Sequence, residues 1–331
     1  QREIQVYCDP NKLEAYGLTV AGISSIIATE NRNVPSGSID IGSNAVRLLI
    51  KEIKEEQGKA HFSKVLMLRV PLRLGFDVFD IGKISEKKEK NMIRLMKAFR
   101  HLMKIYDVKH CRACATSAMR DAKNGMDIIK QIEKKTGVHI DIIDGQEEAK
   151  IIYNNHVEHM EDQKGNYMYV DVGGGSTEIN LLSEGQLVCS RSYNIGTVRM
   201  LNNAVKDSEW ERLKNDLAEL AKSYPQTNII GSGGNINKLY RLADKKNKKK
   251  MTMQVSVLQE LHTRLKALSL EERMEQFGMK PDRADVIIPA GEIFLTIANI
   301  IGASYIHVPV IGLSDGIIDE LYLQNKNNQP A

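Results

Sequence analysis

The stretch that most constrains the fold is residues 169–182, which we predict to form a strand, a tight loop and a second strand. Residues 169–172 are short, apolar and β-branched, as a buried strand requires. Gly173, Gly174 and Gly175 follow. Glycine backbone carries no side chains and can turn its N–H groups towards an anion such as phosphate. Taken alone, the stretch also fits a plain glycine-rich hairpin that binds nothing.

A related pattern lies about half a chain earlier. Asp40 ends a short apolar segment, Gly42, Ser43 and Asn44 follow, and residues 45–50 resume a strand pattern. A third glycine loop occupies residues 229–235. Duplicated hairpins of this kind are typical of the α/β actin-like (ribonuclease H-like) ATPase superfold. We therefore predict two similar domains around an interdomain cleft.

Six short strings then carry a more specific resemblance. They occur in one order along the chain, at residues 40–44, 115–122, 145–149, 171–178, 231–235 and 312–316. In this order they resemble the exopolyphosphatase / guanosine pentaphosphatase (Ppx/GppA) family over residues 38–324. The resemblance implies a Mg²⁺-assisted phosphohydrolase of the stringent response. Its expected substrates are inorganic polyphosphate, which would lose its terminal phosphate, and guanosine pentaphosphate, which would lose its 5′ γ-phosphate.

The resemblance also implies roles for single residues. Glu148, the second glutamate of residues 145–149, corresponds to the residue that orients and deprotonates the attacking water. From the residues alone, the simpler interpretation of Glu148 is a carboxylate favoured by the dipole at a helix N-terminus. We expect Asp171, Glu178 and Asp40 to serve the metal, because Mg²⁺ prefers oxygen ligands. The expected phosphate-binding residues are Gly42, Ser43, Asn44, Arg120, Gly173, Gly174, Gly175, Ser176, Thr177, Gly233 and Gly234.

Composition restricts the partners. The 331 residues carry a net charge of +4, an excess that suits an anionic substrate but does not indicate a nucleic-acid-binding protein. Glu292 interrupts the longest apolar run, so we expect no membrane association. Four cysteines without a disulfide framework favour a reducing, cytoplasmic setting. The substrate is the partner that we expect, and the family resemblance also allows a homodimer.

Residues 1–37 differ from the rest of the chain. They resemble a β-α piece of the periplasmic porter domain of RND-type efflux pumps, which we interpret as a foreign segment joined near Ser38. An ordinary additional β-α unit is the alternative. Pro35 and Gly37 predict that the first strand of the next domain is shortened at its start. We expect domain I over residues 38–147 and domain II over residues 148–331, with the last helix, residues 314–324, packing back on domain I.

Other local patterns give further expectations. Apolar residues in 13–30 predict an amphipathic helix, and a stripe in 92–106 predicts a core-facing helix. Residues 72–82 are rich in Gly, Asp and Phe and predict a loop. Strands that alternate with helices predict mainly parallel sheets.

Two other classes of function stay open at this stage. An actin-like kinase would need an acceptor pocket and an adenosine-binding loop, neither of which is evident in the sequence. A non-catalytic nucleotide-binding module would need only the glycine loops. Phosphate release separates the enzymes from that module, and transfer to an acceptor other than water separates a kinase from a hydrolase.

Overall fold

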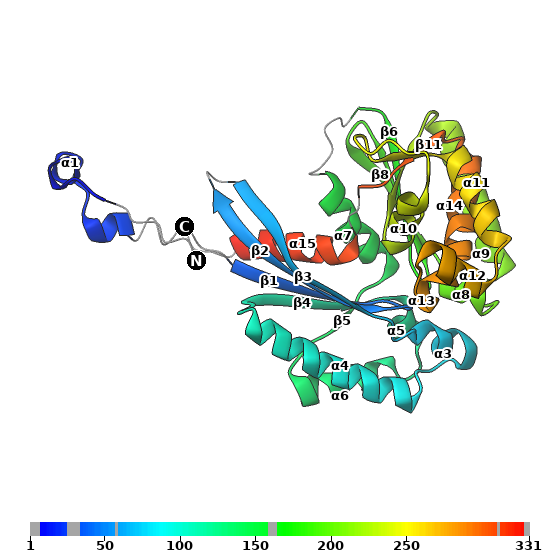
Figure 1. Ribbon diagram of the computed structural model, residues 1–331, viewed down its shortest axis with the longest axis horizontal. Coiled ribbons are helices and arrows are strands. Elements are labelled where there is room, and N and C mark those ends of the chain that lie inside the picture. Colours follow the sequence, from blue (N-terminus) through cyan, green and yellow to red (C-terminus); the bar gives the residue numbers. More distant parts are fainter. Residues whose placement is uncertain (1–6, 25–33, 57–58, 158–163, 310–311, 328–331) are drawn as a thin grey trace.

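The computed structural model describes residues 7–24, 34–56, 59–157, 164–309 and 312–327. These residues form two α/β lobes with a separate N-terminal segment (Figure 1). The helices are α1 Pro10–Ala15, α3 Leu74–Ile81, α4 Glu86–Ile105, α5 Ser117–Asp121, α6 Gly125–Thr136, α7 Gly145–Val157, α8 Thr197–Leu201, α9 Asp207–Ser223, α10 Gly234–Leu242, α11 Val255–Lys266, α12 Leu270–Phe277, α13 Pro281–Ala284, α14 Ile287–Ile301 and α15 Leu313–Asn327.

Each lobe contains one sheet, and the two sheets share a topology. Sheet I has the order β3-β2-β1-β4-β5 and sheet II the order β10-β11-β9-β6-β7-β8. The first strand of each lobe, β1 or β6, pairs with a hairpin partner on one side and a parallel strand on the other. The strands are β1 Val34–Ile41, β2 Val46–Glu56, β3 Lys59–Val70, β4 His110–Ala115, β5 Asp141–Ile142, β6 Asn166–Val172, β7 Thr177–Ser183, β8 Gln186–Tyr193, β9 Asn228–Ser232, β10 Thr252–Gln254 and β11 Tyr305–His307.

The repeated topology is that of the actin-like ATPase fold, as predicted. The expectation of mainly parallel sheets is wrong, however, because both sheets are mixed. The strands joined by the glycine-loop hairpins, β1 with β2 and β6 with β7, are antiparallel. Parallel pairing is confined to β1–β4–β5 and β6–β9–β11, where helices connect the strands.

The first strand of sheet I is not shortened, so that prediction is also wrong. β1 begins at Val34 and passes through both Pro35 and Gly37. Pro35 is tolerated because pairing with β4 starts only at the next residue, and its carbonyl still accepts a hydrogen bond from the Lys109 N–H at 2.9 Å. At Gly37 a Cβ atom would lie 3.3 Å from Cγ1 of Val108, so a small residue suits this position.

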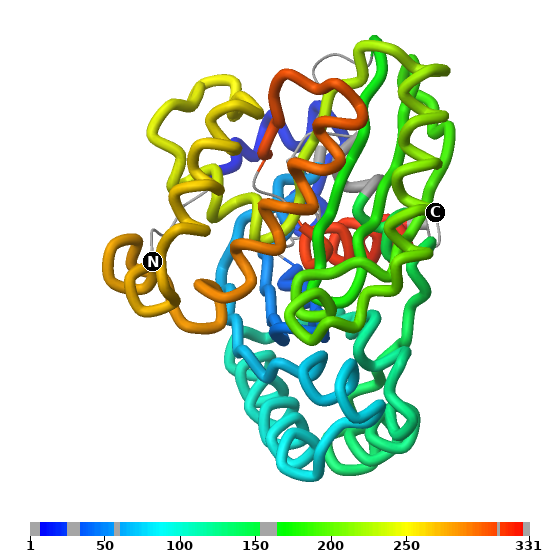
Figure 2. The backbone as a smooth tube through the Cα atoms, turned by 90° about the vertical axis from the view of Figure 1, so that its right-hand side faces the viewer, coloured from blue at the N-terminus to red at the C-terminus, as the bar shows by residue number. Residues whose placement is uncertain are grey.

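Sheet I buries both faces, as its alternating side chains show. Ile39, Ile41 and Leu48 pack on one side with Met96 and Phe99 of α4, which confirms the predicted core stripe of that helix. On the other side, Leu49 of β2 packs against Ile318 of α15. The helix α15 also contacts β1 and β4. The last helix and α7 therefore lie together in the middle of the molecule, between the two sheets (Figure 2).

Two local predictions were wrong for identifiable reasons. The predicted loop at residues 72–82 contains α3, because Leu74 and Val78, four residues apart, bury one helical face, and the helix ends at Gly82 with φ +73°. The predicted helix at 13–30 is interrupted, because α1 stops at Tyr16 and Gly17 has φ +63°. Residues 25–30 of that prediction lie outside the described residues.

Residues 281–301 are long and apolar enough to pass as a membrane-spanning helix by length and composition. They comprise α13 and α14, and 67% of their most apolar window is buried inside the protein. α14 packs against α9, α10 and α11, and its buried side chains belong to the core of the second lobe. Within the described residues this is the one such candidate, and its burial is that of a core helix.

Candidate active site

The two predicted glycine loops have the same internal structure. In the first loop, which follows Asp40, the Gly42 N–H donates to the Ala45 carbonyl at 3.1 Å. In the second, the Gly173 N–H donates to the Ser176 carbonyl at 2.9 Å. Each loop closes the hairpin between the first two strands of its lobe. The duplication in the sequence is thus a duplication in structure.

The two loops pack against each other at the bottom of the interdomain cleft. The hydroxyl groups of Ser43 and Ser117 lie 3.1 Å apart, and both face the second loop. A Cβ atom at Gly175 would lie 1.7 Å from Oγ of Ser117 and 2.8 Å from Oγ of Ser43. Glycine is required at this position because the loops approach so closely.

Helix α8 holds the second loop from behind. The Thr197 N–H donates to the Gly173 carbonyl at 3.0 Å, and the Val198 N–H donates to the Gly174 carbonyl at 2.7 Å. Nε of Arg199 donates to the Gly175 carbonyl at 2.8 Å. Because the N–H and C=O of one peptide point in opposite directions, the N–H groups that follow these carbonyls turn away from α8. They are suited to bind an anion.

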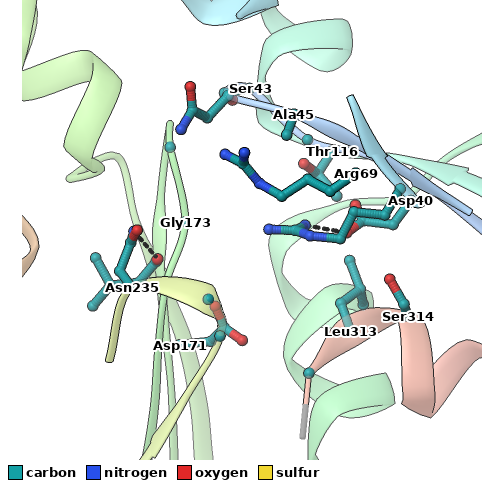
Figure 3. Close-up of a pocket in the computed structure, with 18 of the residues that line it drawn as sticks. Asp40, Ser43, Ala45, Arg69, Thr116, Asp171, Gly173, Asn235, Leu313 and Ser314 are labelled. Carbon is teal, nitrogen blue, oxygen red and sulfur yellow. Dashed lines mark hydrogen bonds and ion pairs between the residues drawn. The ribbon is translucent and has the colours of Figure 1, made fainter. Parts of the chain in front are cut away.

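A cavity of about 410 Å³ opens beside the loops, between the lobes. Asp40, Ser43 and Arg69 lie on one side of it, and Asp171 and Asn235 on the other (Figure 3). Twelve of the residues singled out from the sequence line this cavity, namely Asp40, Gly42, Ser43, Asn44, Glu148, Asp171, Gly173, Gly174, Gly175, Ser176, Gly233 and Gly234.

The other three predicted site residues, Arg120, Thr177 and Glu178, are not among the residues that line the cavity. The Thr177 hydroxyl donates to the Ile195 carbonyl at 2.6 Å, and Nη1 of Arg120 donates to the Ile143 carbonyl at 2.7 Å. Glu178 is buried and accepts a hydrogen bond from the Ser192 hydroxyl at 2.9 Å. Their proposed contacts with phosphate and metal therefore stay predictions.

Glu148 lies at the cavity with an unusual environment. It is 8% exposed, and its Oε2 atom is buried without a hydrogen-bond partner. Burial raises the pKa of Glu148 well above its ordinary value, and the neighbouring charges of Glu178, Asp171 and Asp40 raise it further, against the opposing effect of Arg120. Such a carboxylate can accept a proton near neutral pH.

Of the neighbouring carboxylates, Asp40 and Glu178 are buried and Asp171 is half-buried. Burial raises the pKa of Asp171, whose Oδ2 accepts a hydrogen bond from the Ser232 hydroxyl at 2.8 Å. Burial also raises the pKa of Glu178 to about 7. Asp40 forms an ion pair with Nη1 of Arg47 at 2.5 Å. Several acidic groups thus lie close together, where a bound cation would be stabilising.

The structure also gathers cations that the sequence analysis missed. The basic residues that line the cavity are Arg47, Lys64, Arg69, Lys238, Arg241 and Arg283. Burial, together with the charges of Arg69 and Arg47, lowers the pKa of Arg283 to about 9. These mutually repelling cations favour a bound anion. Of the six, Arg47 could have been predicted from the sequence, because a tight hairpin after Asp40 places Arg47 directly opposite Asp40 on the next strand.

The cavity is bridged by contacts between the lobes. Arg69 of β3 forms an ion pair with Asp282 of α13, and Arg73 forms one with Asp285. The side-chain amide of Asn44 also donates to the Asp282 carbonyl at 3.1 Å. α13 is therefore held across the cleft against the first lobe, which keeps Arg283 beside the cavity.

Comparison with known proteins supports a phosphatase assignment. A bifunctional 3-dehydroquinate synthase/phosphatase of Fusobacterium nucleatum is 29% identical over 86% of this chain, which spans 46% of that protein. A guanosine-5′-triphosphate,3′-diphosphate pyrophosphatase of Aeromonas hydrophila is 24% identical over 85% of this chain, which spans 58% of it. Exopolyphosphatase 1 of Mycobacterium tuberculosis is 24% identical over 76% of this chain and 78% of its own length.

Solved structures agree in fold. The Ppx/GppA family member of Aquifex aeolicus has a TM-score of 0.70 and 26% identity, over 90% of this chain and all of its own. An exopolyphosphatase from Cytophaga hutchinsonii has a TM-score of 0.76 and 22% identity, over 89% of this chain and 99% of its own, and shows the likeness in fold alone.

The family model of Ppx/GppA phosphatases matches residues 50–325. Because this match starts after residue 37, it gives no support to the resemblance of residues 1–37 to an efflux pump, which stays a prediction. The match covers most of the chain, from within β2 of the first lobe to within α15. The chain belongs to the Ppx/GppA phosphatase family.

Proposed function

We propose that this family member releases the terminal phosphate of inorganic polyphosphate, the 5′ γ-phosphate of guanosine pentaphosphate, or both. The observation that carries the proposal is the position of Glu148, a buried carboxylate with an unpartnered oxygen at the edge of the cavity that the glycine loops line. Arg47, Arg69 and Arg283 add positive charge to the same cavity, as a polyanionic substrate requires.

The residues fit a direct attack by water. The glycine loops bind the oxygens of the terminal phosphate, and the cations neutralise the phosphates that follow. Glu148 takes one proton from the attacking water while the new O–P bond forms. The bridging P–O bond breaks, and its electron pair leaves on the shortened phosphate chain. The products are inorganic phosphate and a substrate with one phosphate fewer.

The donor atoms fit Mg²⁺, although not as a cage made by the protein alone. Within the described residues, no group of three or more His, Cys, Asp or Glu side chains is placed so that it could hold a metal ion. Mg²⁺ commonly uses one or two carboxylates together with water and phosphate oxygens. Asp171, with Glu178 and Asp40 beside it, would supply the carboxylates. The bound ion would neutralise charge on the phosphates.

The cellular setting forms part of the proposal. Cys8, Cys111, Cys114 and Cys189 are all free thiols, which suits a reducing compartment, and we propose the cytoplasm. If guanosine pentaphosphate is the substrate, the enzyme acts in the stringent response.

The test is phosphate release, measured side by side with polyphosphates of several lengths and with guanosine pentaphosphate, each with Mg²⁺ and with EDTA. We expect release to require Mg²⁺ and to proceed without an acceptor other than water. The ratio of kcat/KM values for the two substrate classes assigns the substrate. Release from neither class would overturn the proposal in favour of a binding module, and transfer to an added acceptor would favour a kinase.

A further inference from the structure

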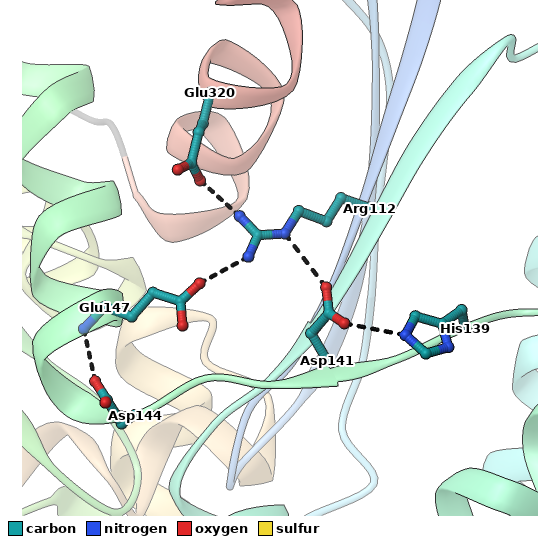
Figure 4. A network of polar contacts seen from close by, with 6 residues as sticks. All are labelled: Arg112, His139, Asp141, Asp144, Glu147 and Glu320. Carbon is teal, nitrogen blue, oxygen red and sulfur yellow. Dashed lines mark hydrogen bonds and ion pairs between the residues drawn. The ribbon is translucent and has the colours of Figure 1, made fainter. Parts of the chain in front are cut away.

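Arg112 of β4 is the centre of an ionic network outside the cavity (Figure 4). Its guanidinium contacts three carboxylates from three elements: Glu320 of α15 at 2.6 Å, Glu147 of α7 at 2.7 Å and Asp141 of β5 at 3.4 Å. Asp141 in turn pairs with His139 at 3.2 Å. The Arg112 side chain is only 18% exposed, whereas the side chains of Glu147 and Asp141 are 45% and 42% exposed and lie at the solvent edge of the network.

The network holds the first turn of α7, which carries Glu148. The carboxylate of Asp144 accepts a hydrogen bond from the Glu147 N–H at 2.8 Å and caps the helix. Arg112 then binds the Glu147 side chain and links this turn to α15 and to sheet I. The backbone and the side chain of the residue next to Glu148 are therefore both restrained.

Such restraint is needed because Glu148 occupies an unfavourable position. Its Oε2 atom has no hydrogen-bond partner. The free energy of a buried carboxylate without a partner falls when it moves into water. The terminal turn of a helix is also the part that most easily frays. A small displacement of this turn would carry Glu148 away from the phosphate.

We infer that Arg112 is a positioning residue that acts through Glu147 to keep Glu148 at the cavity. This inference rests on the proposed role of Glu148. Arg112 is not among the residues that line the cavity. Its loss should therefore lower kcat and leave substrate binding unchanged.

The experiment compares the full-length variants Arg112→Met, Arg112→Lys and Glu147→Gln with the unmodified protein. We expect Arg112→Met to lower kcat by roughly 10- to 100-fold with KM changed by less than about 2-fold, because misplacing a catalytic group by about 1 Å costs this much. Arg112→Lys should recover part of kcat, since an ammonium group keeps the charge but not the fork that binds several carboxylates.

A double-mutant cycle tests the route of the effect. Glu147→Gln alone should cause a smaller loss of kcat, and adding it to Arg112→Met should cause little further loss, because both changes break the same link. Arg191→Met is the matched control. Arg191 pairs with Asp216 of α9 at 2.7 Å and has a similarly shielded side chain, so its loss should cost stability but leave kcat unchanged.

The outcomes separate this inference from the proposed function. Three results would each overturn the positioning role. They are an Arg112→Met variant with the kcat of the unmodified protein, an Arg112→Met variant whose main change is a raised KM, and a double variant whose loss of kcat is the full product of the two single losses. If Arg112→Met fails to fold, Arg112→Lys and Glu147→Gln decide the question by the same criteria. An active Glu148→Gln variant would instead refute the proposed function, whatever Arg112 does.

Discussion

Glu147 and Glu148 are consecutive residues of α7, yet their carboxylates lie in opposite environments. Glu147 is 45% exposed and forms an ion pair with Arg112 at 2.7 Å. Glu148 is 8% exposed, and its Oε2 atom has no partner. Successive residues of a helix point about 100° apart, which places one carboxylate on the ionic network and the other at the cavity. Because of this divergence, a substitution of Glu148 tests the proposed mechanism and the same substitution of Glu147 is its control.

Glu148→Gln should abolish most turnover and leave substrate binding nearly intact. The amide has the same shape but accepts no proton, so the loss of general-base catalysis should reduce kcat by about 10²- to 10⁴-fold. The measurement is kcat and substrate Kd, with circular dichroism to verify folding. Glu147→Gln is the control and should have a much smaller effect. A dead Glu147→Gln enzyme with an active Glu148→Gln enzyme would show that the two roles are reversed.

Asp171→Asn should raise the Mg²⁺ concentration needed for half-maximal activity, because a neutral amide is a weaker ligand for this cation than a carboxylate. The Ser232 hydroxyl, which donates to Asp171 at 2.8 Å, can still donate to the amide oxygen, so the local fold should survive. The check is a Mg²⁺ titration of phosphate release by both proteins. Superimposable titration curves would remove Asp171 from the metal site.

Removal of residues 1–33 should leave activity and thermal stability almost unchanged. The described part of this segment includes α1, which buries none of its residues. Removal of residues 1–37 should instead destabilise the fold strongly, because it deletes half of β1, the central strand of sheet I. Thermal midpoints and phosphate release of the two truncated proteins test this. Loss of both properties in the shorter truncation would show that the N-terminal segment is integral.

Stability should fall as the pH drops through about 6.5, in part because of His262 of α11. Burial lowers the pKa of His262, whose Nε2–H donates to the Ile288 carbonyl at 3.1 Å. The unfolded chain therefore binds a proton there at a higher pH than the folded protein does. Below pH 6.5 this difference should cost up to about 1.4 kcal/mol of unfolding free energy per pH unit.

The variant His262→Gln tests whether His262 causes this pH dependence of stability. Its amide can donate to the same carbonyl but does not titrate, so the unfolding free energy of the variant should depend less on pH between 5 and 7.5. Urea unfolding at several pH values in this range measures both slopes. Equal slopes for the two proteins would exclude His262 as a source of the pH dependence.

Patterns among neighbouring residues were sufficient to predict one part of this protein. The two Asp-and-glycine hairpins, the third glycine loop and the pair of glutamates after Asp144 are local patterns, and they indicate the duplicated fold and twelve of the residues that line the cavity. The apolar stripe of α4 is local in the same way, because helical periodicity is visible within a few turns. The motif order also indicated the family.

The surroundings of each of these residues depend on contacts between segments far apart in the chain, which no local pattern reveals. Asn44 contacts Asp282, 238 positions away, and Arg112 contacts Glu320, 208 positions away. Arg47 of β2, Arg69 of β3 and Arg283 of α13 come together at the cavity. β1 begins at Val34 because it pairs with β2 from that residue onwards. The free energy of a buried charge depends on all groups close in space, so the raised pKa of Glu148 follows from packing and not from its place in the sequence.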